Sequence, residues 1–164
     1  MTAPPMVVMG FHPTTRGFGW VVFETLAAPS DWGLAYARTD KNTKGLHQLR
    51  ELLEQHRPEY LALEAPREGG GPKSDRLRAL HDGVLSLADA FGIAVVLYTR
   101  KDISRAILGH ARGTRQQVAE AIISHVHAFS HRLPPHRKPW ESADRRLALF
   151  SAAALALTVY AQES

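Results

Sequence analysis

The chain has 164 residues, of which 45% are hydrophobic and 22% charged, and this length and composition predict one folded domain over residues 1–164. The sequence contains no cysteine, which excludes thiol catalysis and cysteine-ligated metal sites, and it has neither a membrane-length apolar run nor the basic start of a secretory signal, so we expect a cytoplasmic protein with no membrane association. Its 20 Lys and Arg against 16 Asp and Glu give a net charge of +4, which suits a polyanionic partner and equally an ordinary solvated surface.

The first part of the chain has the pattern of strands. Residues 6–11 and 18–23 are short apolar runs, the second rich in β-branched and aromatic side chains, and a turn containing Pro13 and Gly17 joins them. Residues 32–37 alternate weakly after a break at Pro29 and predict a third strand. Connections this short favour antiparallel pairing.

The rest of the chain alternates between helices and strands. Leucines at helical spacing predict a helix that ends before Pro58. Further strands are predicted at residues 60–64 and 93–98, and further helices at residues 74–91, 102–108, 116–129 and 141–160. We therefore predict an α/β fold with a mixed five-stranded sheet, in which the first three strands are antiparallel and the later ones parallel, flanked by helices.

Polar residues stand where ligands usually bind in such sheets, beyond the carboxyl ends of parallel strands. His12 closes the first strand and Glu64 closes the strand at residues 60–64. Glu141 and Asp144 are three positions apart at the start of the last helix and so share one face of it. If that helix start crosses the sheet ends, the three carboxylates converge.

Converging carboxylates repel one another unless a cation lies between them, and Mg²⁺ is bound by one or two carboxylates together with phosphate oxygens. Such a cluster is what two-metal hydrolysis of a phosphodiester requires. Acidic residues in the first turn of a helix are also favoured by the helix dipole alone, so Glu141 and Asp144 are open to a purely structural interpretation. Glu64 is harder to explain that way, because a carboxylate that ends an apolar strand is costly to bury without a partner.

Several segments, taken in chain order, resemble the RuvC-type Holliday-junction resolvases, which have the RNase H-like fold. The segments are the hairpin at residues 7–13 and 16–20, the strand at 60–64, the strand, basic helix, glycine turn and helix at 98–109 and 113–118, and the acidic helix start at 141–144 with the alanine-rich stretch at 152–157. They span nearly the whole chain. The resemblance implies an endonuclease of branched DNA that works as a homodimer with Mg²⁺ or Mn²⁺, held by Glu64, Glu141 and Asp144.

The chain departs from this family at the first catalytic position. The family carries an aspartate before the proline of the first hairpin, where this sequence has His12, and Glu141 stands where aspartate is usual. Imidazole is a poor ligand for Mg²⁺ and a better one for Mn²⁺. His12 therefore occupies the fourth ligand position of a site with altered metal preference, marks a site that no longer cuts, or is a hydrogen-bonded structural residue.

Basic residues follow the glycine loop and enter the next helices, in the regions that line the junction-binding surface of the resembled family. They are Lys73, Arg76, Arg78, Arg100, Lys101, Arg105, Arg112 and Arg115. Lys and Arg directed at phosphates position a duplex without reading its sequence, and a branch is recognised by shape. A scattered solvated surface is the alternative explanation.

Two hypotheses follow from these patterns. The first is a branched-DNA-binding protein that also cuts through a divalent-metal site with His12 in place of the usual aspartate. The second is a non-catalytic branched-DNA-binding or structural module. A nucleotide-binding member of the wider ribonuclease H and actin-like group is a minor third, because the chain lacks room for the second domain of such ATPases.

Overall fold

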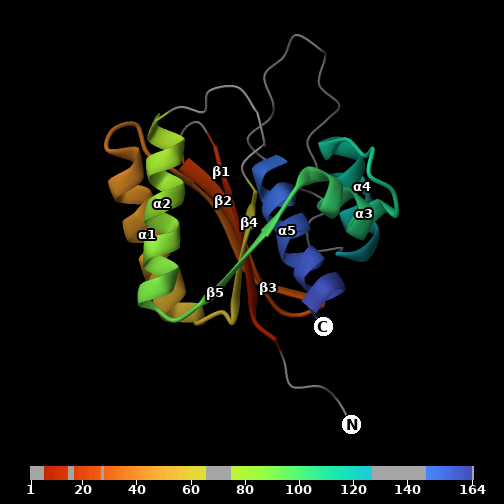
Figure 1. The fold of residues 1–164 in the computed structure, drawn as a ribbon, viewed down its shortest axis with the longest axis horizontal. Coiled ribbons are helices and arrows are strands. Elements are labelled where there is room, and N and C mark those ends of the chain that lie inside the picture. Colours follow the sequence, from red (N-terminus) through yellow and green to blue (C-terminus); the bar gives the residue numbers. More distant parts are fainter. Residues whose placement is uncertain (1–5, 15–16, 27, 66–74, 127–146, 164) are drawn as a thin grey trace.

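The computed structural model describes residues 6–14, 17–26, 28–65, 75–126 and 147–163, which form a five-stranded sheet with helices on both faces (Figure 1). The strands are β1 (Val8–Pro13), β2 (Gly17–Thr25), β3 (Ala28–Tyr36), β4 (Tyr60–Glu64) and β5 (Ala94–Tyr98). The helices are α1 (Lys41–His56), α2 (Asp75–Ala90), α3 (Arg100–Leu108), α4 (Arg115–His125) and α5 (Leu147–Glu163).

The strands lie in the order β3-β2-β1-β4-β5. The β1/β2 and β2/β3 pairs are antiparallel, whereas β4 is parallel to β1, and β5 is parallel to β4. The predicted mixed sheet, antiparallel first and parallel later, is therefore confirmed.

The third strand begins earlier than its sequence pattern indicates. It starts at Ala28, and Pro29 pairs with Phe23 at an irregularity of the β2–β3 ladder. A proline is tolerated there because β3 is an edge strand, where one side of the backbone needs no ladder partner. The break expected at Pro29 is therefore a bulged part of the strand.

The two faces of the sheet have different helical covers. In Figure 1, α1 and α2 lie on one face and α5 on the other, with α3 and α4 on the far side of α5. Successive side chains of β2 point to opposite faces of the sheet and belong to two hydrophobic cores. Val21 and Phe23 pack on the α5 side, and Trp20 and Val22 pack on the α1–α2 side. Both faces are thus buried, as the near-continuous apolar sequence of β2 requires.

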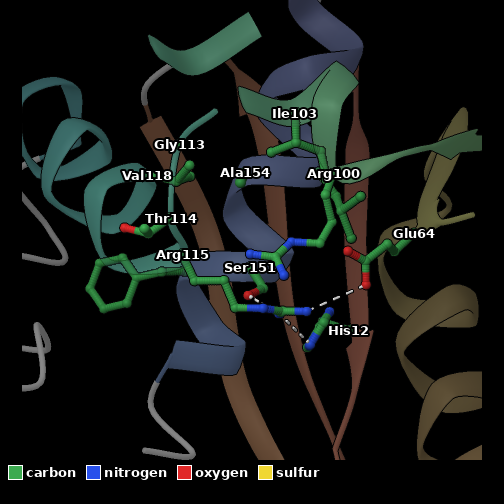
Figure 2. Close-up of a pocket in the computed structure, with 12 residues that line it drawn as sticks. His12, Glu64, Arg100, Ile103, Gly113, Thr114, Arg115, Val118, Ser151 and Ala154 are labelled. Carbon is green, nitrogen blue, oxygen red and sulfur yellow. Dashed lines mark hydrogen bonds and ion pairs between the residues drawn. The ribbon is translucent and has the colours of Figure 1, made fainter. Parts of the chain in front are cut away.

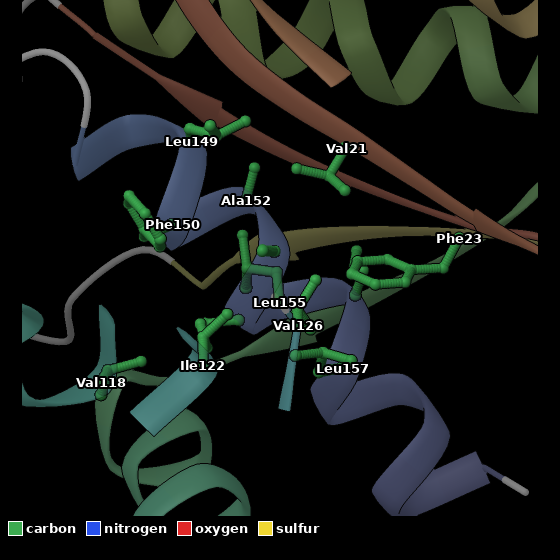
Figure 3. Packing of buried hydrophobic residues seen from close by; sticks show 14 of the residues in the cluster. Val21, Phe23, Val118, Ile122, Val126, Leu149, Phe150, Ala152, Leu155 and Leu157 are labelled. Carbon is green, nitrogen blue, oxygen red and sulfur yellow. The ribbon is translucent and has the colours of Figure 1, made fainter. Parts of the chain in front are cut away.

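Helix α5 lies between the sheet and the α3–α4 pair. From Leu147 to Val159 every residue of this helix is buried except Ser151. Figure 3 shows Leu149, Ala152 and Leu155 between Val21 on the sheet side and Ile122 on the α4 side. A helix that is apolar on all sides is a buried helix, and this one is the centre of its core.

Contact between α5 and the sheet is close enough to involve the backbone. A Cβ added at Gly10 would lie 1.8 Å from the carbonyl oxygen of Ala152, so only glycine permits this approach. At the other end of the helix, the Tyr160 hydroxyl donates to the Met6 carbonyl oxygen at 2.5 Å. The position of α5 against β1 is therefore fixed at both ends. In the described part of the chain, no helix is long and apolar enough to span a bilayer.

Candidate functional site

The carboxyl ends of β1, β4 and β5 meet at one edge of the sheet because these strands are parallel neighbours. His12 lies near the end of β1, and Glu64 is the last residue of β4. Arg100 begins α3 two residues after β5 ends. All three line one pocket with Arg115 of α4 and Ser151 of α5 (Figure 2). Five elements far apart in the sequence therefore contribute one polar side chain each to this edge.

Local sequence determines where α3 and α4 begin. Each follows a threonine that acts as N-cap: the Thr99 hydroxyl accepts from the Asp102 amide, and the Thr114 hydroxyl accepts from the Gln117 amide, both at 3.1 Å. The Asp102 and Gln117 side chains accept in return from the cap amides, which completes two capping boxes. Arg100 and Arg115 are thereby placed at the first position of their helices.

A buried serine controls the turn between α3 and α4. The Ser104 hydroxyl donates to the His110 carbonyl oxygen at 2.5 Å and accepts from the Gly113 amide at 2.8 Å. A Cβ at Gly113 would lie 2.1 Å from Leu108 Cδ1 and 2.8 Å from Ser104 Oγ, so a larger residue there would displace both side chains. Since Arg115 follows two residues later, this turn sets its distance from the sheet edge.

Arg115 lies between the two strand-end residues. Its Nη1 is 3.1 Å from His12 Nε2 and donates to Ser151 Oγ at 3.1 Å, and its Nη2 forms an ion pair with Glu64 Oε2 at 3.6 Å (Figure 2). A guanidinium only donates hydrogen bonds, so Nε2 of His12 is the acceptor and the ring carries its proton on Nδ1. The positive charge beside His12 and Glu64 is thus supplied by the protein itself.

His12 is kept in its uncharged form by these surroundings. Burial, and after it the neighbouring charges of Arg115 and Arg100, lower its pKa from 6.5 to about 3. A neutral imidazole at this place accepts a hydrogen bond and adds no charge to the site.

The pocket is a small cavity of about 30 Å³ with an apolar back wall. The wall consists of Ile103, Val118, Phe150, Ala154 and Leu155. The pocket thus combines an apolar wall with the polar side chains of His12, Glu64, Arg100, Arg115 and Ser151.

The described residues do not fit a divalent metal ion. Among residues 6–14, 17–26, 28–65, 75–126 and 147–163, no group of three or more His, Asp or Glu side chains could hold one. The pocket offers one carboxylate, one imidazole and two guanidinium groups, and guanidinium groups repel a cation. The predicted ligands Glu141 and Asp144 lie outside the described residues.

The predicted DNA-binding residues fall into three groups. Arg100 and Arg115 line the pocket. Lys101, Arg105 and Arg112 are exposed on α3 and the following turn. The third group is at the start of α2.

In that third group, Arg76 donates to the Thr14 carbonyl oxygen at 2.8 Å and to Asn42 Oδ1 at 3.2 Å, so it links α2 to the first hairpin and to α1. Arg78 is exposed and pairs with Asp75. Lys73 lies outside the described residues.

Sequence reasoning missed the residues that organise the pocket. Ser151 carries no motif, and its role follows only from the packing of α5 on the sheet. Ser104 and Thr114 were also missed, although the pattern Thr114, Arg115, Gln116, Gln117 is a capping box that could have placed Arg115 at a helix start.

Comparisons with known proteins point to one family. Residues 8–151 match the family described as crossover junction endodeoxyribonuclease RuvC. No curated protein sequence matches the chain significantly.

Solved structures give the same fold. RuvC of Thermus thermophilus has a TM-score of 0.71 at 19% identity, covering 96% of this chain and 95% of that one. The same protein in complex with a Holliday junction substrate gives 0.71 at 21% identity, with 94% and 93% covered. The yeast mitochondrial Holliday junction resolvase Ydc2 gives 0.59 at 12% identity, with 98% and 80% covered. The RNase H-like fold predicted from the resemblance is therefore confirmed, and the chain belongs to the RuvC family.

Proposed function

We propose that this protein binds branched duplex DNA, in particular four-way junctions, and does not cleave it. Membership of the RuvC family supports a branched DNA ligand. The structure of Thermus thermophilus RuvC with a Holliday junction substrate is that of a relative with the same fold. The exposed basic residues Lys101, Arg105 and Arg112 supply phosphate contacts beside the pocket.

One observation supports the proposal that the protein does not cleave DNA. The guanidinium of Arg115 lies between His12 and Glu64. The resemblance places metal-holding oxygen ligands at these two positions. Here one of the two is a neutral imidazole, and a fixed cation already pairs with the remaining carboxylate. A divalent ion bound there would have to displace Arg115 against charge repulsion.

A metal-dependent endonuclease is the second candidate, and Glu64 favours it. This carboxylate ends a buried strand and its side chain is only 25% exposed, which is the setting of a ligand rather than of a solvated surface charge. In this alternative, Glu141, Asp144 and His12 complete a site that prefers Mn²⁺ to Mg²⁺.

One experiment separates the two candidates. Purified protein is incubated with labelled four-way junction and with linear duplex, in EDTA, in Mg²⁺ and in Mn²⁺, and binding and cleavage are scored in the same samples. We expect preferential junction binding in all three conditions and no cutting.

The variant Glu64→Gln controls this experiment. It should bind the junction at least as well as the wild type, because it removes a negative charge from the pocket. Junction cleavage in either metal that is lost in Glu64→Gln would establish the endonuclease instead. Absence of junction binding would refute both candidates.

We also propose that the protein acts in the cytoplasm as a homodimer, since a four-way junction has two equivalent halves that a two-fold symmetric protein can contact alike. Sedimentation velocity with and without junction DNA tests the oligomeric state. A single protomer on each junction would refute the dimer.

A further inference from the structure

A second depression lies near the carboxyl ends of α3, α4 and α5, away from the polar pocket. Its volume is about 310 Å³, which is within the range of ligand-binding sites. The residues that line it are mostly apolar and come from three helices and one turn. They include Ile107 of α3, Ile122 of α4, Leu157, Tyr160 and Ala161 of α5, and Leu26 of the turn between β2 and β3. We call this depression the apolar groove.

Part of the apolar groove is open to solvent. Leu26 is 63% exposed, the largest exposed fraction of any large hydrophobic residue in the described part of the chain, and Ala161 is exposed as well. Ile122 and Leu157, on neighbouring helices in Figure 3, are buried and form the floor. Contiguous apolar surface that stays exposed on a folded protein is typical of an interaction site.

Acidic side chains stand at the edge of the groove. The hydroxyl of Tyr160 lies 3.2 Å from the carbonyl oxygen of Phe23, and Glu24 is the next residue. Burial, and after it the nearby charges of Glu59 and Glu24, raise the pKa of Tyr160 to about 12. Glu163 is three positions after Tyr160 on α5 and shares its face of the helix. All three glutamates are exposed, and we call them the acidic rim.

Other charges near the groove do not offset the acidic rim. On α3 and α4, the charged residues within two positions of a lining residue are Arg105 and Glu120, one of each sign. All three helices end near the groove, and the carboxyl end of a helix carries partial negative charge that favours cations. The groove is therefore surrounded by negative charge, although the whole chain has a net charge of +4.

The walls also restrict the backbone of whatever fills the groove. They are mainly the sides of helices, whose N–H and C=O groups are paired within each helix, so the groove offers no free strand edge. A segment that binds there must pair its own backbone groups, as an α-helix does. Amphipathic helices fill such grooves with apolar side chains spaced three or four positions apart.

We propose that the apolar groove binds a partner protein through a short amphipathic helix that carries aliphatic residues on one side and Lys or Arg beside them. The aliphatic side chains enter the groove, and the cations face the acidic rim. This inference adds a protein-binding site to the proposed function and does not depend on DNA binding.

Two synthetic peptides test this proposal. Each is fluorescein-labelled, about 18 residues long, and has leucine at helical spacing along one side. The remaining positions are lysine in one peptide and glutamate in the other. Fluorescence anisotropy with the full-length protein measures both affinities.

We expect the lysine peptide to bind at least about tenfold more tightly than the glutamate peptide. Its affinity should fall as NaCl is raised, because salt screens exposed charges. Attraction by net charge alone predicts the opposite preference, since the chain as a whole is positive.

Variants of two lining residues locate the binding site. Leu26→Ser removes exposed apolar surface, and Ala161→Trp fills the groove, so each should weaken binding of the lysine peptide by about tenfold. Both positions are exposed, so we expect both variants to fold, and circular dichroism verifies this. The matched control is Leu97→Ser on β5, where the leucine is 45% exposed and does not line the groove. It should leave the affinity unchanged.

The acidic rim is tested by reversing its charge. A double variant with Glu24→Lys and Glu163→Lys should weaken binding of the lysine peptide by about tenfold, strengthen binding of the glutamate peptide, and reduce the dependence on salt. Glu54→Lys changes an exposed glutamate on α1, away from the groove, and should alter neither affinity.

Two kinds of result would overturn the proposal. The first is equal affinity for the two peptides, or an affinity for the lysine peptide that is unchanged in Leu26→Ser and Ala161→Trp. The second concerns another copy of this chain as the occupant. Sedimentation velocity that shows a dimer for the wild type and a monomer for Ala161→Trp would assign the groove to contact between copies. Neither result bears on the proposed function, which junction binding tests by itself.

Discussion

The two faces of the sheet are covered in different ways. On the α5 face, helix and strand approach until backbone meets backbone, at Gly10 and Ala152. On the α1–α2 face, large side chains such as Phe18, Leu49 and Leu53 lie between helix and sheet. The polar pocket belongs to the first face, since both Arg115 and Ser151 come from that side.

This difference shows what each face contributes. Close backbone packing leaves α5 no freedom to slide or rotate, so Ser151 keeps its place beside Arg115. Side-chain packing on the other face tolerates small changes, because side chains can repack where a backbone cannot. We therefore expect substitutions on the α5 face to disturb both stability and the pocket, and those on the α1–α2 face to disturb stability alone.

The largest expected effect is a difference in stability between two glycine-to-alanine variants, one on each face of the sheet. Gly10→Ala places a Cβ against the Ala152 carbonyl and should lower the free energy of unfolding by at least about 3 kcal/mol. Gly45→Ala on α1 meets Phe18 at an ordinary 3.7 Å and should raise it by about 0.5–1 kcal/mol. Urea denaturation followed by circular dichroism measures both. Similar losses in the two variants would contradict the difference between the faces.

The next effect is a pH dependence on the α5 face. His12 has a pKa of about 3 in the folded protein and 6.5 in the unfolded chain, so between these values the unfolded chain binds the extra proton. The contribution of this group to stability is complete above pH 6.5 and is lost as the pH falls toward 3, by up to about 1.4 kcal/mol per unit.

His12→Gln lacks this titration, and groups common to both proteins cancel in the comparison. The free energy of unfolding of His12→Gln, relative to that of the wild type, should therefore rise by roughly 2 kcal/mol when the pH is lowered from 7 to 5. Unfolding curves at the two pH values measure it. A constant difference would show that His12 titrates normally in the folded protein.

A smaller effect is expected where the α3–α4 turn supports the pocket. Ser104→Ala removes the hydroxyl that bridges His110 and Gly113, so two hydrogen bonds are lost, and it should cost about 1–3 kcal/mol. Junction affinity should fall as well, because Arg115 follows this turn. Ser86→Ala on α2, at an exposed position, is the control and should change neither quantity. A stability loss with unchanged junction affinity would separate the turn from the pocket.

The smallest effect is expected for a hydrogen-bonded pair on the other face of the sheet. His56 Nε2 donates to Asp31 Oδ2 at 2.8 Å and joins the end of α1 to strand β3. Asp31→Asn keeps an acceptor but loses the charge, and it should lower the free energy of unfolding by about 0.5–1 kcal/mol. Junction affinity should stay the same. A clear loss of junction affinity would mean that the two faces are coupled.

Much of the fold could be predicted from residue patterns, because apolar periodicity reports which sides of an element are buried. The hairpin at the start, the strand ending in Glu64 and the helix around Leu49 were all indicated in this way. The start of β3 could not be predicted in this way. In the sequence alone Pro29 indicates the end of a strand, and the sheet tolerates it only because β3 is an edge strand.

The pocket was less predictable. The sequence predicted that His12 and Glu64 lie at the same edge of the sheet, because both follow parallel strands whose carboxyl ends meet there. The position of Arg115 does not follow from any pattern: it was expected on a DNA-facing surface, and it lies between the two strand-end residues. That placement depends on the α3–α4 turn and on how α5 packs, which are long-range properties that no local motif encodes.

The anchoring of α5 at both ends also has a consequence for synthesis of the chain. The bond from Tyr160 to Met6 spans 154 positions, and the same late helix makes the close contact with Gly10 on β1. Contacts so distant in sequence form slowly, since a long loop must close before they contribute. A nascent chain on the ribosome therefore carries an open apolar sheet face until residues 147–163 have emerged, and in that interval the exposed surface favours aggregation.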